Sequence, residues 1–190
     1  MNRFKSYWCQ LMIENDANFV HKRKLSLANK LVITALMSAL ATIFQAAGNL
    51  IPGIGLFISP FATLPIFLAI CYSIREGVLS YILTICLLFI IEPSELIVFP
   101  FTTGLLGIAL GLSFLQLKRR IWVVSFSATC LLIGIVIVLD IFRFPVLGPT
   151  VHTTLDIKVI LLIFILSFLY CWIYAGLCRI MMNRLYKVLY

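Results

Sequence analysis

Six apolar stretches, each a candidate membrane span, restrict the fold of this chain more than any other feature. Charged residues interrupt positions 31–178 at only four places, and the first uninterrupted stretch, 31–74, holds two spans around a Pro52-Gly53 loop. Apolar residues make up 63% of the chain and charged residues 12%, against roughly 45–50% and 25% in soluble domains. Because a membrane span takes about 20 residues, little of the chain remains beyond short loops. The sequence therefore predicts an all-α, polytopic membrane protein with six transmembrane helices in one compact bundle.

The membrane domain is predicted over residues 31–178, between a cytoplasmic N-terminal tail, 1–30, and a short basic cytoplasmic tail, 179–190. Pro60 and Pro65 predict that the second span is kinked or partly re-entrant. The run Glu92-Pro93-Ser94-Glu95 predicts a tight corner, because proline cannot prolong the preceding helix. The six spans are expected at about 31–47, 57–74, 77–91, 96–117, 121–139 and 157–178.

The basic residues predict how the chain is oriented. If the N-terminus is cytoplasmic, thirteen of the fifteen Lys and Arg residues fall on the inner side, and only Arg143 and Lys158 fall outside. Short loops with this imbalance follow the positive-inside rule. We therefore expect a multi-pass protein of the cell membrane with both termini in the cytoplasm. The net charge of +8 is then explained by topology, and we expect no nucleic-acid partner.

Small residues recur at helical spacing in two of the spans. Small side chains let helix backbones approach closely in lipid, where packing replaces the hydrophobic driving force. The sequence leaves open whether each stripe packs inside the bundle or against a partner. The stripes are Ala35 with Ala39, then Thr34, Ser38 and Thr42 on an adjoining strip, and Thr103, Gly107 and Gly111 in the fourth span.

The order of these features resembles the substrate-binding S components of energy-coupling factor (ECF) transporters. The likeness covers roughly residues 28–180 and rests on the alanine pair, the Pro-rich second span ending in Arg75-Glu76-Gly77, and the fourth span opening FPFTTGLLGIALG. It implies a subunit that captures a vitamin-like micronutrient outside and delivers it through a membrane coupling subunit driven by cytoplasmic ATPases. By this resemblance Ala35 and Ala39 dock on the coupling subunit. The chain has no phosphate-binding GxxxxGK[ST] run and is not expected to be an enzyme.

The sequence departs from two branches of that family. Its N-terminus, Met1-Asn2-Arg3, lacks the histidine of the nickel and cobalt members, so neither a metal substrate nor a cofactor is expected. Thiamine-type members stack their ligand on tryptophan, whereas Trp8, Trp122 and Trp172 fall on the predicted cytoplasmic side or inner half. The vitamin is therefore left unassigned.

Charged and polar residues on the predicted external face are the candidates for solute binding. Glu95 and Asp156 fall in the first turns of predicted helices, where the helix dipole favours a carboxylate, so both are expected to be structural. Glu92 and Asp140 end the third and fifth spans, where the dipole disfavours a carboxylate. Such acids would suit a solute with an amine or a protonated heterocycle, although exposure to water explains them equally well. The expected substrate-binding residues are Asn49, Glu92, Asp140, Arg143 and His152.

Two other classes of protein remain open. A small accessory or scaffold membrane protein that binds partner helices would carry the same small-residue stripes without needing the external mixture of acids and bases. A membrane-embedded enzyme would need a denser set of polar residues than the Ser, Thr and Gln45 found inside the spans. Neither HExxH nor GxSxG occurs, which disfavours the enzyme.

Overall fold

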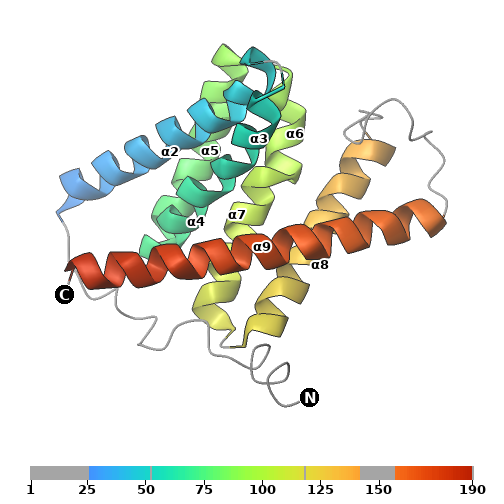
Figure 1. The fold of residues 1–190 in the computed structure, drawn as a ribbon. Helices are drawn as coiled ribbons and strands as arrows, with labels where there is room; N and C mark the ends of the chain where they lie inside the picture. Colours follow the sequence, from blue (N-terminus) through green and yellow to red (C-terminus); the bar gives the residue numbers. More distant parts are fainter. Residues whose placement is uncertain (1–25, 52, 118, 142–156, 190) are drawn as a thin grey trace.

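Every regular element in the part of the chain that the structure describes is a helix (Figure 1). The computed structural model describes residues 26–51, 53–117, 119–141 and 157–189, with the backbone alone at 157, 158 and 185–189. The predicted tail up to residue 25 and the residues Arg143 and His152 lie outside the described residues. The elements are α2 (Leu27–Leu50), α3 (Gly55–Ile58), the 3-10 helix η2 (Ser59–Ala62), α4 (Thr63–Tyr72), α5 (Ile74–Ile91), α6 (Glu95–Phe101), α7 (Thr103–Gln116), α8 (Arg120–Asp140) and α9 (Ile157–Leu189).

Six helical stretches of the described chain are long and apolar enough to cross a membrane, which confirms the predicted all-α bundle. The outer surface of the bundle is rich in exposed large apolar side chains such as Phe89, Ile90 and Leu161. Soluble monomers rarely expose apolar surface on this scale. The fold is therefore compatible with a multi-pass membrane protein. The six stretches are Leu27–Leu50, Gly55–Tyr72, Ile74–Ile91, Glu95–Gln116, Arg120–Asp140 and Val159–Arg184.

Proline interrupts two of these stretches. The second runs through α3, η2 and α4, so that Pro60, one of the two prolines that predicted a kinked or partly re-entrant span, lies in a short 3-10 helix. The fourth, expected as a span over about 96–117, is divided into α6 and α7 at Thr102, whose φ and ψ are −116° and −95°. Pro100, inside α6, has no backbone N–H and its ring crowds the carbonyl four residues earlier. The break at Thr102 comes two residues after Pro100.

Helices α4 and α7 pack closely because glycines of α7 face isoleucines of α4. A Cβ atom added at Gly107 would lie 2.8 Å from Cβ of Ile66, and one added at Gly111 would overlap the side chain of Ile70. Thr103, the first member of this stripe, donates a hydrogen bond to Gln45 of α2. The stripe of small residues in the fourth span is therefore an internal packing surface.

The two ends of the bundle differ in charge. One end, called the basic end, carries Arg75, Arg119 and Arg120 at the starts of α5 and α8, together with Arg179 and Arg184 near the end of α9. The other, called the acidic end, carries Glu92, Glu95 and Asp140. Helix α9 packs on α8 and crosses in front of α7 and α8 at a steep angle in Figure 1. This crossing shapes the cavity described below.

Candidate functional site

Two of the predicted binding residues, Asn49 and Glu92, meet at the acidic end through Ser94. Asn49 Nδ2 donates to Ser94 Oγ at 2.6 Å, and that hydroxyl donates to Glu92 Oε1 at 2.6 Å. Glu92 is the last residue whose N–H is bonded into α5, and Pro93 cannot prolong that helix. The backbone therefore turns a corner between α5 and α6, which brings Glu92 and Ser94 together. A hydroxyl partner thus offsets the unfavourable helix dipole at Glu92. These two hydrogen bonds join the end of α2 to the corner between α5 and α6.

Glu95, expected to be structural, is the first residue of α6 and belongs to a second set of hydrogen-bonded side chains. Gln45 Nε2 donates to Glu95 Oε2 at 2.7 Å, while Gln45 Oε1 accepts from Thr103 Oγ1 at 2.6 Å. Gln45 and Glu95 are both buried. This pairing was not predicted from the sequence, where its one signal is a glutamine inside an apolar span, since a buried amide needs hydrogen-bond partners.

Asp140 belongs to neither of these two sets of hydrogen-bonded side chains. It is exposed as the last residue of α8, and no hydrogen bond or ion pair joins it to another described residue. The predicted binding set is therefore only partly brought together: Asn49 and Glu92 share Ser94, Asp140 does not join them, and Arg143 and His152 lie outside the described residues.

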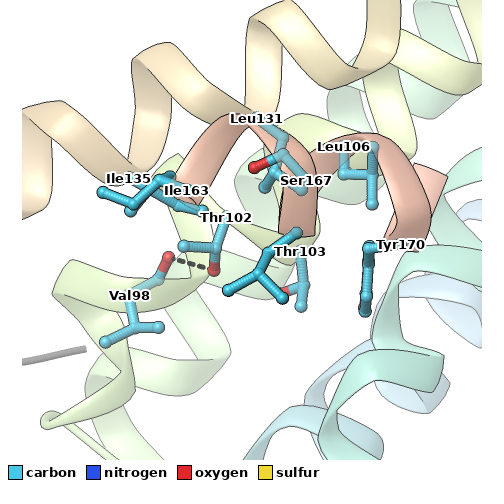
Figure 2. A pocket seen from close by; sticks show the side chains of 10 residues that line it. Val98, Thr102, Thr103, Leu106, Leu131, Ile135, Ile163, Ser167 and Tyr170 are labelled. Carbon is cyan, nitrogen blue, oxygen red and sulfur yellow. Dashed lines mark hydrogen bonds between the residues drawn. The ribbon is translucent and has the colours of Figure 1, made fainter. Parts of the chain in front are cut away.

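A cavity of about 220 Å³ lies beside the break between α6 and α7 (Figure 2). Its walls come from α6, α7, α8 and α9, and none of the ten lining residues is charged. Six are Val, Leu or Ile. The other four carry hydroxyl groups: Thr102, Thr103, Ser167 and Tyr170. Asn49, Glu92 and Asp140 are not among the residues that line it.

The cavity lies close to the acidic end. Val98 is three residues into α6, Ile135 five residues from the end of α8, and Ile163 six residues into α9. At about 1.5 Å of rise per residue these positions are roughly 5–9 Å inside the helix ends, while Leu131 and Tyr170 extend the cavity deeper into the bundle. On the α8 side a Cβ atom at Gly134 would overlap the carbonyl oxygen of Phe101, so the end of α6 is held close to α8. The cavity lies at the break, between these helices and α9.

Ser167 is the lining residue whose hydrogen bonding is incomplete. Its Oγ atom has no hydrogen-bond partner among the described residues, and the residue is 2% exposed. A buried polar group without a partner costs about 1–3 kcal/mol. Ser167 was not predicted from the sequence, since one serine in an apolar span is unremarkable until the surrounding helices are placed.

The two adjoining strips of small residues on α2 differ in burial. Thr34, Ser38 and Thr42 are buried, and Thr34 Oγ1 lies 3.0 Å from Glu76 Oε2 of α5. Ala35 and Ala39 are exposed. Within the described residues, then, the threonine and serine strip packs inside the bundle and the alanine pair is left uncovered.

Comparison with known proteins gives no match among family models, curated proteins or solved structures. Among the described residues, no group of three or more His, Cys, Asp or Glu side chains is placed to hold a metal ion. The cavity and the exposed alanine pair are therefore the features from which a function is argued.

Proposed function

We propose that the protein is the substrate-binding S component of an ECF-type importer, which captures a small vitamin-like solute outside the cell. Delivery would pass through a coupling subunit driven by cytoplasmic ATPases, and the chain itself would perform no catalysis. The observation that carries the proposal is the exposure of Ala35 and Ala39 beside a strip that is fully buried. A small-residue pair that packs on nothing within the described bundle suits a partner helix that approaches closely in the membrane.

The distribution of charge supports an orientation for this subunit in the cell membrane. The basic end would face the cytoplasm by the positive-inside rule, and the even number of spans would place both termini there. The acidic end would then face outward, and the cavity would begin one or two helical turns below the outer surface. A solute arriving from outside would reach it without crossing the bundle.

The docking role is tested by placing bulk on the alanine face. Ala35→Trp and Ala39→Trp should each reduce the coupling subunit that co-purifies with the chain about tenfold, because the partner helix can no longer approach. Val78→Trp, at an exposed position of α5, is the matched control and should leave co-purification unchanged. All three positions are exposed, so the thermal unfolding midpoints should stay close to that of the parent. Equal recovery of the coupling subunit with both alanine variants would overturn the docking role.

A further inference from the structure

The hydrogen bonds around the cavity define what kind of molecule fits it. Thr102 Oγ1 donates to the carbonyl of Val98 at 2.7 Å, drawn as a dashed line in Figure 2. Thr103 Oγ1 donates to Gln45 Oε1 at 2.6 Å. Both threonine protons are therefore already used within the protein. Ser167 Oγ, buried and without a partner among the described residues, still has a proton to donate.

The walls exclude a charged group. No lining residue carries a charge, and moving an ion from water into such surroundings without a counter-charge is costly. The volume of about 220 Å³ is below the roughly 300–1,000 Å³ of pockets for drug-sized ligands. It exceeds the roughly 150 Å³ of an engineered apolar cavity that takes benzene. The space thus suits a molecule of one or two rings.

We propose that this cavity is the solute site and that the solute is an uncharged, mainly apolar ring compound with one acceptor, such as a carbonyl oxygen, for the Ser167 hydroxyl. This substrate class rests on the proposed importer function. The aliphatic walls would bury the ring, and the buried Ser167 hydroxyl would fix its orientation. The site differs from the external acids, which favour a cationic solute.

Three probes of nearly equal shape test the proposal. Acetophenone offers a carbonyl acceptor, α-methylstyrene replaces that oxygen by a CH2 group, and benzoate carries a full negative charge. Each is titrated against the purified full-length chain in detergent, and the rise in thermal unfolding midpoint gives an apparent Kd. Partition of a probe into detergent is the same for parent and variant, so it cancels from their ratio.

Acetophenone should raise the midpoint of the parent, and benzoate should not. Ser167→Ala should weaken acetophenone about fivefold and leave α-methylstyrene unchanged, as expected for the loss of one neutral hydrogen bond. Ser80→Ala is the matched control, since Ser80 Oγ is also buried and without a partner but lies on α5, away from the cavity. Val98→Phe should fill the cavity and abolish the response to both uncharged probes.

Several results would overturn the proposal. They are equal acetophenone affinity in the parent and Ser167→Ala, binding of benzoate as tight as that of acetophenone, or no response of the folded parent to any probe. The measurement needs no coupling subunit. A failed titration therefore removes the solute site, whereas undiminished recovery of the coupling subunit with both alanine variants removes the docking role on which the importer function rests.

Discussion

Gln45 donates a hydrogen bond from Nε2 to Oε2 of Glu95 across 2.7 Å, joining positions 50 residues apart in the sequence. The bond links the interior of α2 to the first turn of α6, and Thr103 extends it to the first residue of α7. Since both partners are buried, neither is readily re-solvated if the other is lost. The three side chains therefore fix α2 against the broken fourth span, on which the cavity depends.

Removing one partner of this buried pair should destabilise the fold. Gln45→Leu leaves the Glu95 carboxylate without its donor, and we expect a loss of about 1–3 kcal/mol in the free energy of unfolding. Denaturant titration in detergent, followed by tryptophan fluorescence, measures it. Asn49→Ala, one turn further along α2, removes an exposed amide bonded to an exposed serine and should cost less than about 0.5 kcal/mol.

The double variant Gln45→Leu with Glu95→Leu supplies the decisive comparison. Replacing both partners removes the stranded carboxylate, so this variant should be more stable than Gln45→Leu alone. If the double variant is the less stable one, the hydrogen bond is not what makes Gln45 important.

Close packing of α7 on α4 should make Gly111 intolerant of even one added methyl group. In Gly111→Ala the new Cβ would overlap the side chain of Ile70, and the strain should cost about 1–3 kcal/mol of stability. Gly176→Ala is the control, since its Cβ would meet only the flexible end of Arg120, at 3.3 Å. Thermal unfolding midpoints measure both. Equal midpoints for the two variants would contradict the packing seen between α4 and α7.

The sequence predicted most of the fold, because hydropathy and charge along the chain are local properties that the membrane selects directly. The spans begin and end within a few residues of their predicted limits, except that α9 continues to Leu189. Pro100 was a visible signal for the break at Thr102, but proline often sits in a span without dividing it. The break could not be placed without its neighbours.

The candidate site was predicted much less well, because it depends on contacts between distant segments. The hydrogen bonds that join Asn49, Ser94 and Glu92 require only the corner between α5 and α6 and the adjacent end of α2. Asn49 and Glu92 were predicted as site residues, and Ser94 was not. The cavity needed the crossing of α9, the break in the fourth span and the approach of Gly134 to Phe101. Periodicity along one helix reports none of these. Ser167 acquires its significance only once they are in place.

Cysteine labelling tests the orientation with the two ends of α8. Arg119 and Asp140 are both exposed and flank a single helix, so they should lie on opposite sides of the membrane. On a background without the native cysteines, a membrane-impermeant maleimide added to intact cells should label Asp140→Cys and spare Arg119→Cys. Lysis should make both react. Labelling of Arg119→Cys alone in intact cells would invert the assigned topology.

Neutralising Glu92 and Asp140 tests whether the solute binds in the cavity or at the acids that the sequence predicted. Neither Glu92 nor Asp140 lines the cavity, so Glu92→Gln combined with Asp140→Asn should leave acetophenone affinity within about twofold of the parent. The amine of similar shape, 1-phenylethylamine, is positively charged at neutral pH and should bind neither protein, because no counter-charge lines the cavity. Midpoint shifts with both probes provide the measurement. If instead the amine binds the parent and weakens tenfold to a hundredfold in the variant, as loss of a charged hydrogen bond of about 1.5–3 kcal/mol requires, the solute site lies at the acids and not at Ser167.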